Sequence, residues 1–259
     1  MFAEALAALD TVRATIDDAG ISCDVMPDGW LKITHRPEKV AALEQEAALL
    51  RSRFGLAAEV LDAERLAAEH VRGGEAYAAL RWPVSFAMHP LKLAYGLLRA
   101  ARAQGALVFR DTPVIALAKQ NGRHVLTTPH GQVRARELVI ATNGYTVERV
   151  FPRLSGRLLP VLSNIVVTQP LDADEIEAGN FRTSDCMSDT RTLLYYYRRL
   201  PDNRILLGGK GPVRGGAVAM ARHRAALTRT IAAKFPFVRE PRAAYFWGGW
   251  VALTPDSIP

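Results

Sequence analysis

Cysteine is scarce in this chain of 259 residues, which contains only Cys23 and Cys186. Neither belongs to a C-x-x-C pair of the kind that binds zinc or exchanges disulfides. This absence removes the usual signal for a cysteine-based metal or redox site, and we expect no metal centre. A low cysteine content fits a reducing compartment, so we expect a cytoplasmic protein.

Long apolar runs are also lacking. No stretch approaches the roughly 18 apolar residues that a membrane-spanning helix needs. The first 20 residues, MFAEALAALDTVRATIDDAG, include acidic residues and have helical periodicity, without the uninterrupted apolar core of a signal peptide. We therefore expect neither an integral membrane segment nor a secretory leader.

Charge of one sign is nowhere concentrated. The net charge is +7, from 33 basic and 26 acidic residues, and only six of the basic residues are lysine. The arginines are scattered and no known nucleic-acid motif is present, which disfavours a nucleic-acid-binding function. A solvated basic surface is the simplest interpretation, and attraction for anionic ligands is the alternative.

The composition itself is that of a folded, core-forming protein. Hydrophobic residues make up 49% of the chain and charged residues 23%, which is typical of globular domains and not of disordered segments. The length suits one large domain or two small ones.

Helical patterns recur along the chain. The clearest begins at Pro90, which suits a first helical turn, and ends before Gly105, which suits a C-terminal cap. His89, just before it, is expected to be a helix cap or a surface residue. Further helices are predicted at residues 2–19, 37–54, 62–71 and 217–235.

Strand patterns in the first half alternate with these helices. We expect a hairpin over 21–34 and strands at 76–82, 106–109, 114–118, 124–128 and around Val133. The turn Asn121-Gly122 joins two of the short strands, and Leu138–Ala141 suits a strand buried on both faces. A doubly wound sheet with a small antiparallel insertion gives this order, and ligands bind at the ends of its strands.

The second half has a mostly antiparallel pattern. Strands are expected at 158–168, 192–198, 204–208 and 243–253. The turn Leu200-Pro201-Asp202-Asn203 joins the second and third of them.

Four segments carry a resemblance to a known family. They are AMHPLKLAYGLLRAARAQGALVFRDTPV (87–114), ELVIATNGYT (137–146), DTRTLLYYYRRLPDNRILLGGK (189–210) and WGGWVALTPDSIP (247–259). In this order they resemble the D-amino-acid-oxidase-like FAD-dependent oxidoreductases, and most of all the gamma-glutamylputrescine oxidase branch. Linking stretches such as ISCDVMPDGWLKITHRPE are similar too, so the resemblance covers nearly the whole chain.

The resemblance implies an α/β plus α+β fold with two parts. Residues 1–20 and 87–150 would form a partial FAD-binding domain of the doubly wound type, and 21–86 with 151–246 an antiparallel-sheet substrate domain. Residues 247–259 would return to the FAD-binding domain. The family opens with a G-x-G-x-x-G turn that holds the FAD diphosphate and closes with a Gly-rich flavin segment. Neither occurs here, so we expect a fragment that is cut at both ends.

The resemblance also implies the positions that contact FAD. They are Val114, Ala141, Thr142, Asn143, Gly144, Gly208, Gly209, Trp247, Gly248 and Asp256. The glycines would let the flavin approach the backbone closely. Ordinary strand packing and strand-to-loop turns are the alternative interpretation of these positions.

Flavin oxidation of an amine needs groups that position the substrate more than it needs an acid–base triad. We predict this role for Tyr195, Tyr197, Arg198 and Lys210. Alternation along a strand puts Tyr195 and Tyr197 on one face and Tyr196 on the other. Arg198 could bind a carboxylate, and in some relatives a lysine near the flavin assists the reaction with oxygen. Core packing of the tyrosines and a solvated Arg198 are the alternatives.

The predicted function is FAD-dependent oxidation of the C–N bond of an amine or amino acid, such as a gamma-glutamylputrescine-like substrate. Oxygen or another acceptor would take the electrons from the flavin. The alternative is a noncatalytic remnant, or a module that cannot hold FAD alone. Missing strands would leave exposed apolar surface, so we also expect poor solubility or association.

Overall fold

The computed structural model describes residues 2–212 and 216–255. The chain divides into two compact units. Unit 1 contains Met1–Ala101 and Asn164–Trp247, and unit 2 contains Arg102–Ser163 and Gly248–Pro259. The boundaries between the units fall inside one helix and two long strands.

The helices of the described residues lie almost where the sequence predicts them. They are α1 (Phe2–Asp18), α2 (Val40–Phe54), α3 (Ala63–Glu69), α4 (Pro90–Ala103), α5 (Ala173–Ala178) and α6 (Ala217–Lys234), with a 3-10 turn, η1 (Pro37–Lys39), before α2. The short helix α5 was not predicted. It begins with a capping box, because Asp172 accepts a bond from the Glu175 N–H and the Glu175 side chain accepts one from the Asp172 N–H.

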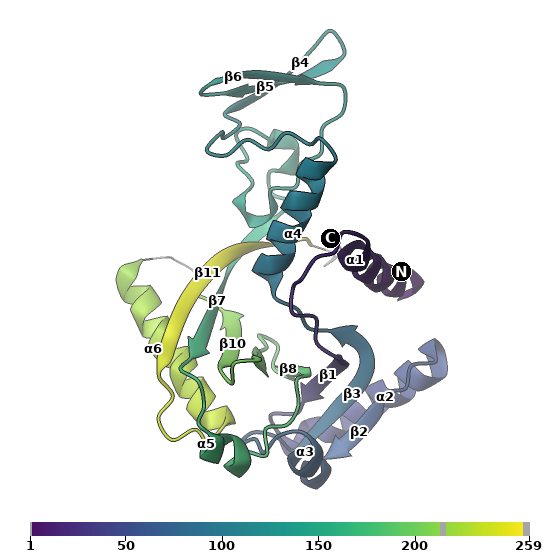
Figure 1. The fold of residues 1–259 in the computed structure, drawn as a ribbon, viewed down its shortest axis with the longest axis vertical. Coiled ribbons are helices and arrows are strands. Elements are labelled where there is room, and N and C mark those ends of the chain that lie inside the picture. The colour runs from purple at the N-terminus through teal and green to yellow at the C-terminus, as the bar shows by residue number, and fades with distance from the viewer. Residues whose placement is uncertain (1, 213–215, 256–259) are drawn as a thin grey trace. The chain divides into compact units, whose positions relative to one another are not determined.

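The largest element is a mixed eight-stranded sheet (Figure 1). Its strands, in sheet order, are β11 (Ala243–Leu253), β7 (Leu159–Thr168), β10 (Ile205–Lys210), β9 (Tyr196–Arg199), β8 (Cys186–Asp189), β1 (Asp28–Ile33), β3 (Ala78–Phe86) and β2 (Glu59–Asp62). β1 runs parallel to β8 and antiparallel to β3, and the pairs β8–β9, β9–β10 and β2–β3 are antiparallel. β2 and β8 were not predicted.

The predicted hairpin over 21–34 is wrong in its first arm. Only β1 forms, and it is a central strand in which Trp30 pairs with Trp82 on one side and with Cys186 on the other. Asp24 adopts a φ of +53°, which interrupts an extended run. The segment before β1 instead packs Ile21 and Cys23 into a small buried cluster.

One face of this sheet forms the main core. Leu31, Ile205 and Leu207 on the strands pack with Leu227 and Ile231 of α6, and α3 and α5 contribute to the same cluster. On the opposite face, α2 covers β2 and β3 through Leu43, Ala47 and Leu80. Further along that opposite face, β9 carries the half-buried polar side chains of Tyr196 and Arg198.

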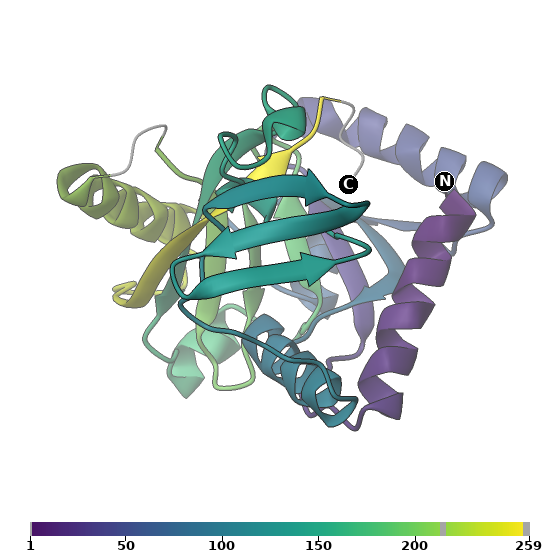
Figure 2. The same cartoon turned by 90° about the horizontal axis from the view of Figure 1, so that it is seen from above.

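Unit 2 contains a separate antiparallel sheet of three strands (Figure 2). The strands are β4 (Ala116–Gln120), β5 (Arg123–Thr128) and β6 (Gly131–Ala135), followed by the 3-10 turns η2 (Asn143–Tyr145) and η3 (Pro152–Leu154). The turn predicted at Asn121-Gly122 joins β4 and β5, and both residues have positive φ, +49° and +74°, as a type I′ turn requires. The mixed sheet and this separate sheet confirm the expected mixed α/β fold.

Two predicted strands of unit 2 are absent from the described residues. The segments 106–109 and 138–141 have no strand pairing there, and their apolar side chains other than that of Leu138 are exposed. Val139 is 86% exposed, Leu107 82% and Phe109 67%. A strand requires a neighbouring backbone for its hydrogen bonds, and no described strand pairs with either segment. An apolar sequence was therefore not sufficient for these two segments to form strands.

Candidate functional site

The open face of the large sheet carries a group of aromatic and polar side chains, which we call the Tyr196 face. Tyr196 pairs directly with Ser188 of β8 and with Gly208 of β10. Directly paired residues point to the same side of a sheet. The Trp30 indole N–H donates to the Ser188 hydroxyl at 3.0 Å, which ties β1 into the same surface. Tyr196 thus lies on a surface of polar and aromatic groups, on the face of the sheet opposite α6.

The two glycines of β10 do not leave space for a ligand at their Cα atoms. A Cβ on Gly208 would lie 2.2 Å from the Tyr196 ring, and one on Gly209 would lie 2.8 Å from the Tyr195 ring. The glycines are needed because tyrosine rings lie across them on the two faces of the strand. Their role as places where the flavin approaches the backbone stays a prediction.

The prediction that Tyr195 and Tyr197 face the substrate conflicts with their positions. Tyr197 is only 4% exposed and packs edge-on against Phe235, with ring centroids 5.6 Å apart. Burial raises the pKa of its hydroxyl, which stays protonated. Tyr195 is partly buried against the same core. The predicted alternation is present, and packing with α6 decides that the Tyr197 side of β9 belongs to the core. The substrate role of these tyrosines stays a prediction.

A buried ionic cluster supports the core side of β9. The Lys234 ammonium of α6 lies 2.8 Å from the Asp189 carboxylate and 4.7 Å from the centre of the Tyr197 ring. Asp189 also accepts bonds from the Arg191 guanidinium and from the Tyr195 N–H. Burial by itself would raise the pKa of Asp189, but hydrogen bonds from Lys234, Tyr195 and Arg191 hold it below its usual value.

Arg198 is two residues beyond Tyr196 on β9 and therefore shares its face. Its guanidinium donates to the backbone oxygen of Met88 at 2.8 Å, which fixes the head group. Arg198 lines a cavity of about 280 Å³ together with Asp24, His89 and Asp202. His89 also caps α4, since its ring nitrogen accepts from the Lys92 N–H at 3.4 Å. Arg198 is thus the predicted residue that lies in a polar cavity.

Lys210 ends β10 and is exposed. Alternation from Gly208 puts it on the side of the strand that carries the Tyr196 ring. It lies at the end of β10 away from the β9–β10 turn, and Arg198 lies toward that turn. The structure therefore aligns Arg198, Tyr196 and Lys210 along one face without bringing them into a single cluster.

In unit 2, two predicted cofactor segments meet. The Asn143 side-chain oxygen accepts from the N–H groups of Gly144 and Ala252, both at 2.7 Å. The Tyr145 hydroxyl accepts from the Trp250 N–H at 3.2 Å. A Cβ on Gly144 would lie 2.7 Å from the Trp250 carbonyl carbon. The ATNG segment is thus joined to the end of β11, and Gly144 is required by this packing.

The other predicted cofactor positions are placed individually. Ala141, Thr142 and Gly248 are exposed, and Val114 is half-buried in the loop before β4. Trp247 is 47% exposed, and its backbone oxygen accepts from the buried Asn164 side chain at 3.3 Å. Asp256 lies outside the described residues.

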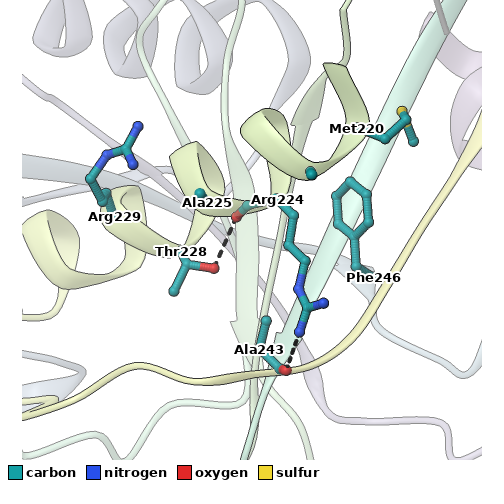
Figure 3. Close-up of a pocket in the computed structure, with 8 residues that line it drawn as sticks. Met220, Arg224, Ala225, Thr228, Arg229, Ala243 and Phe246 are labelled. Carbon is teal, nitrogen blue, oxygen red and sulfur yellow. Dashed lines mark hydrogen bonds between the residues drawn. The ribbon is translucent and has the colours of Figure 1, made fainter. Parts of the chain in front are cut away.

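A larger hollow, of about 610 Å³, lies beside α6 and β11 (Figure 3). Met220, Ala225 and Phe246 give it an apolar lining. The polar bonds drawn there are internal: Arg224 donates to the Ala243 carbonyl at 2.8 Å, and Thr228 donates to the Arg224 carbonyl at 2.9 Å. The smaller cavity at Arg198 is therefore the better candidate, because oppositely charged side chains converge on it.

In residues 2–212 and 216–255, no group of three or more His, Cys, Asp or Glu side chains could hold a metal ion. Among those residues no helix is both long and apolar enough to cross a membrane.

Comparisons with known proteins agree on one family. The family model described as "DAO: FAD dependent oxidoreductase" matches residues 1–259. Gamma-glutamylputrescine oxidoreductase of Escherichia coli (strain K12) is 29% identical over 254 residues, which cover 96% of this chain and 57% of that protein. This chain therefore spans little more than half the length of that relative.

Solved structures share the fold. Glycine oxidase from Geobacillus kaustophilus superposes with a TM-score of 0.75 at 20% identity, over 98% of this chain and 65% of that one. L-proline dehydrogenase from P. horikoshii gives a TM-score of 0.76 at 17% identity, over 97% of this chain and 67% of that one.

Proposed function

The chain belongs to the family of FAD dependent oxidoreductases, and from this premise we propose that it forms the substrate side of an enzyme that oxidises the C–N bond of an amine or amino acid. The observation that carries the proposal is the Tyr196 face, where Tyr196 and Arg198 lie on one side of β9 beside a polar cavity. Arginine and tyrosine side chains bind and orient a polar substrate, which is the task that a flavoenzyme leaves to its protein.

The bound flavin would supply the oxidising chemistry, by accepting hydride from the carbon next to the substrate nitrogen. We propose that Tyr196 orients the reacting end of the substrate and that Arg198 holds a distant polar end. Lys210, exposed on the same side of the sheet, would lie where oxygen or another electron acceptor reacts.

The described residues fit FAD in part. The backbone at Gly208, Gly209 and Gly144 is already covered by Tyr196, Tyr195 and Trp250, so these glycines offer no open cradle. Ala141, Thr142 and Gly248 are exposed, and we propose them as the positions that border the cofactor. The sequence contains no G-x-G-x-x-G turn for the diphosphate.

The proposed substrate is gamma-glutamylputrescine or a similar conjugate with an amine at one end and an amino-acid group at the other. Its support is the named activity of the Escherichia coli relative and the mixed charges at Arg198. We keep as a proposal the division into an FAD-binding part (1–20, 87–150 and 247–259) and a substrate part (21–86 and 151–246). The cytoplasmic location also stays a prediction.

A second candidate is a noncatalytic remnant, or a module that needs another polypeptide to hold FAD. The observation that favours it is the exposed apolar pair of segments in unit 2, where Leu107 and Val139 have no described strand beside them. An enzyme and a remnant differ in whether amine substrates reduce flavin in the presence of the chain.

A matched pair of tyrosine variants tests the proposed role. With FAD and gamma-glutamylputrescine under anaerobic conditions, Tyr196→Phe should slow flavin reduction by about tenfold or more, as expected for the loss of one hydrogen bond to a polar substrate. Tyr197→Phe, on the core face, should leave that rate within about twofold. Equal rates for the two variants, both matching the unmodified chain, would remove Tyr196 from the mechanism.

A further inference from the structure

The cavity beside Arg198 carries charges of both signs. Asp24 and Asp202 line it together with Arg198. Lys92 donates to both oxygens of Asp24 at 2.7 Å, and Arg204 donates to one oxygen of Asp202 at 2.9 Å. These partners orient both carboxylates, and the hydrogen bond from Lys92 lowers the pKa of Asp24. A ligand with a single charge would meet like charges somewhere on this lining.

Arg198 has the geometry of a carboxylate anchor. The bond to the Met88 carbonyl holds its guanidinium in place, and a guanidinium has further N–H groups arranged as a fork that matches a carboxylate. Leu200 gives the same cavity an apolar wall, which suits the methylene groups of an amino-acid side chain. The volume of about 280 Å³ is enough for one amino-acid group.

The cavity also has a fixed relation to Tyr196. Arg198 and Tyr196 are alternate residues of β9 on the same face, roughly 7 Å apart along the strand. The β9–β10 turn, which contains Asp202, contributes to the lining of the cavity. An elongated molecule can therefore place one end in the cavity and the other end over Tyr196.

We propose that this cavity binds the zwitterionic α-amino-acid group of the substrate, with Arg198 on the carboxylate and Asp202 and Asp24 on the ammonium. This assignment rests on the proposed function in one respect: the proposed function says that the end of the substrate outside this cavity is the amine that is oxidised. It makes the preferred substrate class elongated amines that end in a free amino acid. Simple diamines and dicarboxylates lack one of the two charges and bind less well.

Binding can be measured without flavin by ligand-observed saturation-transfer NMR on the full chain. The probes are L-glutamate, which has both charges, putrescine, which has only ammonium groups, and glutarate, which has only carboxylates. L-glutamate should show the strongest transfer, and Arg198→Gln should weaken its affinity by about tenfold, the effect of one charge-assisted hydrogen bond. Arg53→Gln, at an exposed position in the last turn of α2, is the matched control and should change nothing.

A second variant tests the ammonium contact. Asp202→Asn should weaken L-glutamate several-fold while leaving glutarate binding equal or stronger, since it removes only negative charge. Circular dichroism checks that each variant is folded, and Arg198→Lys, which keeps the charge, serves if Arg198→Gln unfolds. The proposal is overturned if L-glutamate shows no transfer. It is also overturned if the Arg198 and Asp202 variants bind L-glutamate as tightly as the unmodified chain does. Because the binding experiment contains no flavin, such a failure would not contradict the proposed oxidoreductase function, which the flavin-reduction experiment tests separately.

Discussion

Unit 1 and unit 2 differ in how far the apolar side chains of comparable segments are buried. In unit 1, the aromatic residues around α6 are sealed in the core, and Phe235 is 1% exposed. In unit 2, Phe109 and Val139 project from segments that pair with no described strand. Both sets of residues have the apolar character of core positions. The difference teaches that neighbouring strands and helices, more than side-chain type, decide whether such a segment becomes part of a core.

The same contrast applies to polar groups. Unit 1 buries the ionic pair Asp189–Lys234 and surrounds it with tyrosine rings. Within unit 2, the exposed side chains of Asn143 and Tyr145 accept hydrogen bonds from backbone N–H groups at the end of β11. We therefore expect substitutions in the core of unit 1 to lower the free energy of unfolding more than substitutions in unit 2.

A matched pair of phenylalanine truncations should show the largest difference. Phe235→Ala removes a ring from the packed aromatic cluster with Phe181 and Tyr197 and should lower the free energy of unfolding by about 3–5 kcal/mol. Phe109→Ala removes an exposed ring and should change it by less than about 0.5 kcal/mol. Urea unfolding followed by circular dichroism measures both. Similar losses in the two variants would mean that unit 2 has a core of comparable strength.

Breaking the buried ion pair should have the next largest effect. Asp189→Asn removes the nearer carboxylate from the buried Lys234 ammonium and leaves it only Glu75, at 3.7 Å, which should cost about 3 kcal/mol of stability. Glu240→Gln is the matched control, because its pair with Arg242 is exposed and contributes little. A stability loss that is equal in the two variants would contradict the role given to the buried cluster.

The Asp189–Lys234 pair should also make the stability of the folded chain depend on pH. Burial would raise the pKa of Asp189, but its hydrogen bonds to Lys234, Tyr195 and Arg191 lower it overall. Its folded-state pKa is therefore below the value of about 3.9 in the unfolded chain. The stabilisation is present above that value and is lost as the pH falls through the folded-state pKa. Thermal unfolding between about pH 5 and 2 should show a smaller acid-dependent loss for Asp189→Asn than for the unmodified chain.

A glycine substitution tests the contact between Gly144 and the end of β11 within unit 2. Gly144→Ala places a methyl group against the Trp250 backbone and should cost about 1–3 kcal/mol through overpacking. Gly216→Ala has open space around the new methyl group and should be nearly neutral. Limited proteolysis should cut the Gly144 variant faster within residues 102–163. Unchanged cleavage would show that the contact with β11 does not hold this segment.

The smallest effect on stability, but a visible effect on solubility, is expected from the exposed apolar segments. The double variant Leu107→Ser and Val139→Ser should leave the unfolding free energy within about 0.5 kcal/mol and reduce association measured by light scattering. Leu207→Ser, in the core of unit 1, is the contrasting variant and should unfold the chain. Unchanged association of the double variant, or a loss above about 2 kcal/mol, would show that these side chains are covered.

Local patterns predicted much of the fold. Helices α4 and α6, the type I′ turn at Asn121-Gly122 and the long strands β7 and β11 follow from periodicity, proline and glycine positions that the sequence contains. The first arm of the hairpin before β1 failed because pairing partners lie far away in the chain, at Trp82 and Cys186. The short elements β2, β8 and α5 have too few residues for a clear period.

The candidate site was harder to predict because it depends on which side of a strand faces α6. Arg198 was named from the sequence and lies in a polar cavity, whereas Tyr195 and Tyr197 were chosen over Tyr196. The glycines at 208 and 209 were assigned to a ligand, but tyrosine rings lie over them. Asp24 and Asp202 gave no signal in the sequence, since only folding brings them beside Arg198.

The most direct test of the central claim is a spectral titration of FAD with the full chain, followed by anaerobic addition of gamma-glutamylputrescine. Titration avoids the need for FAD to survive removal of the free cofactor, which matters because the sequence has no glycine turn for the diphosphate. The account predicts that the flavin bands near about 370 and 450 nm shift on binding and that the 450 nm band bleaches with substrate. An unchanged flavin spectrum at every chain concentration would contradict the proposed enzyme and favour the noncatalytic module.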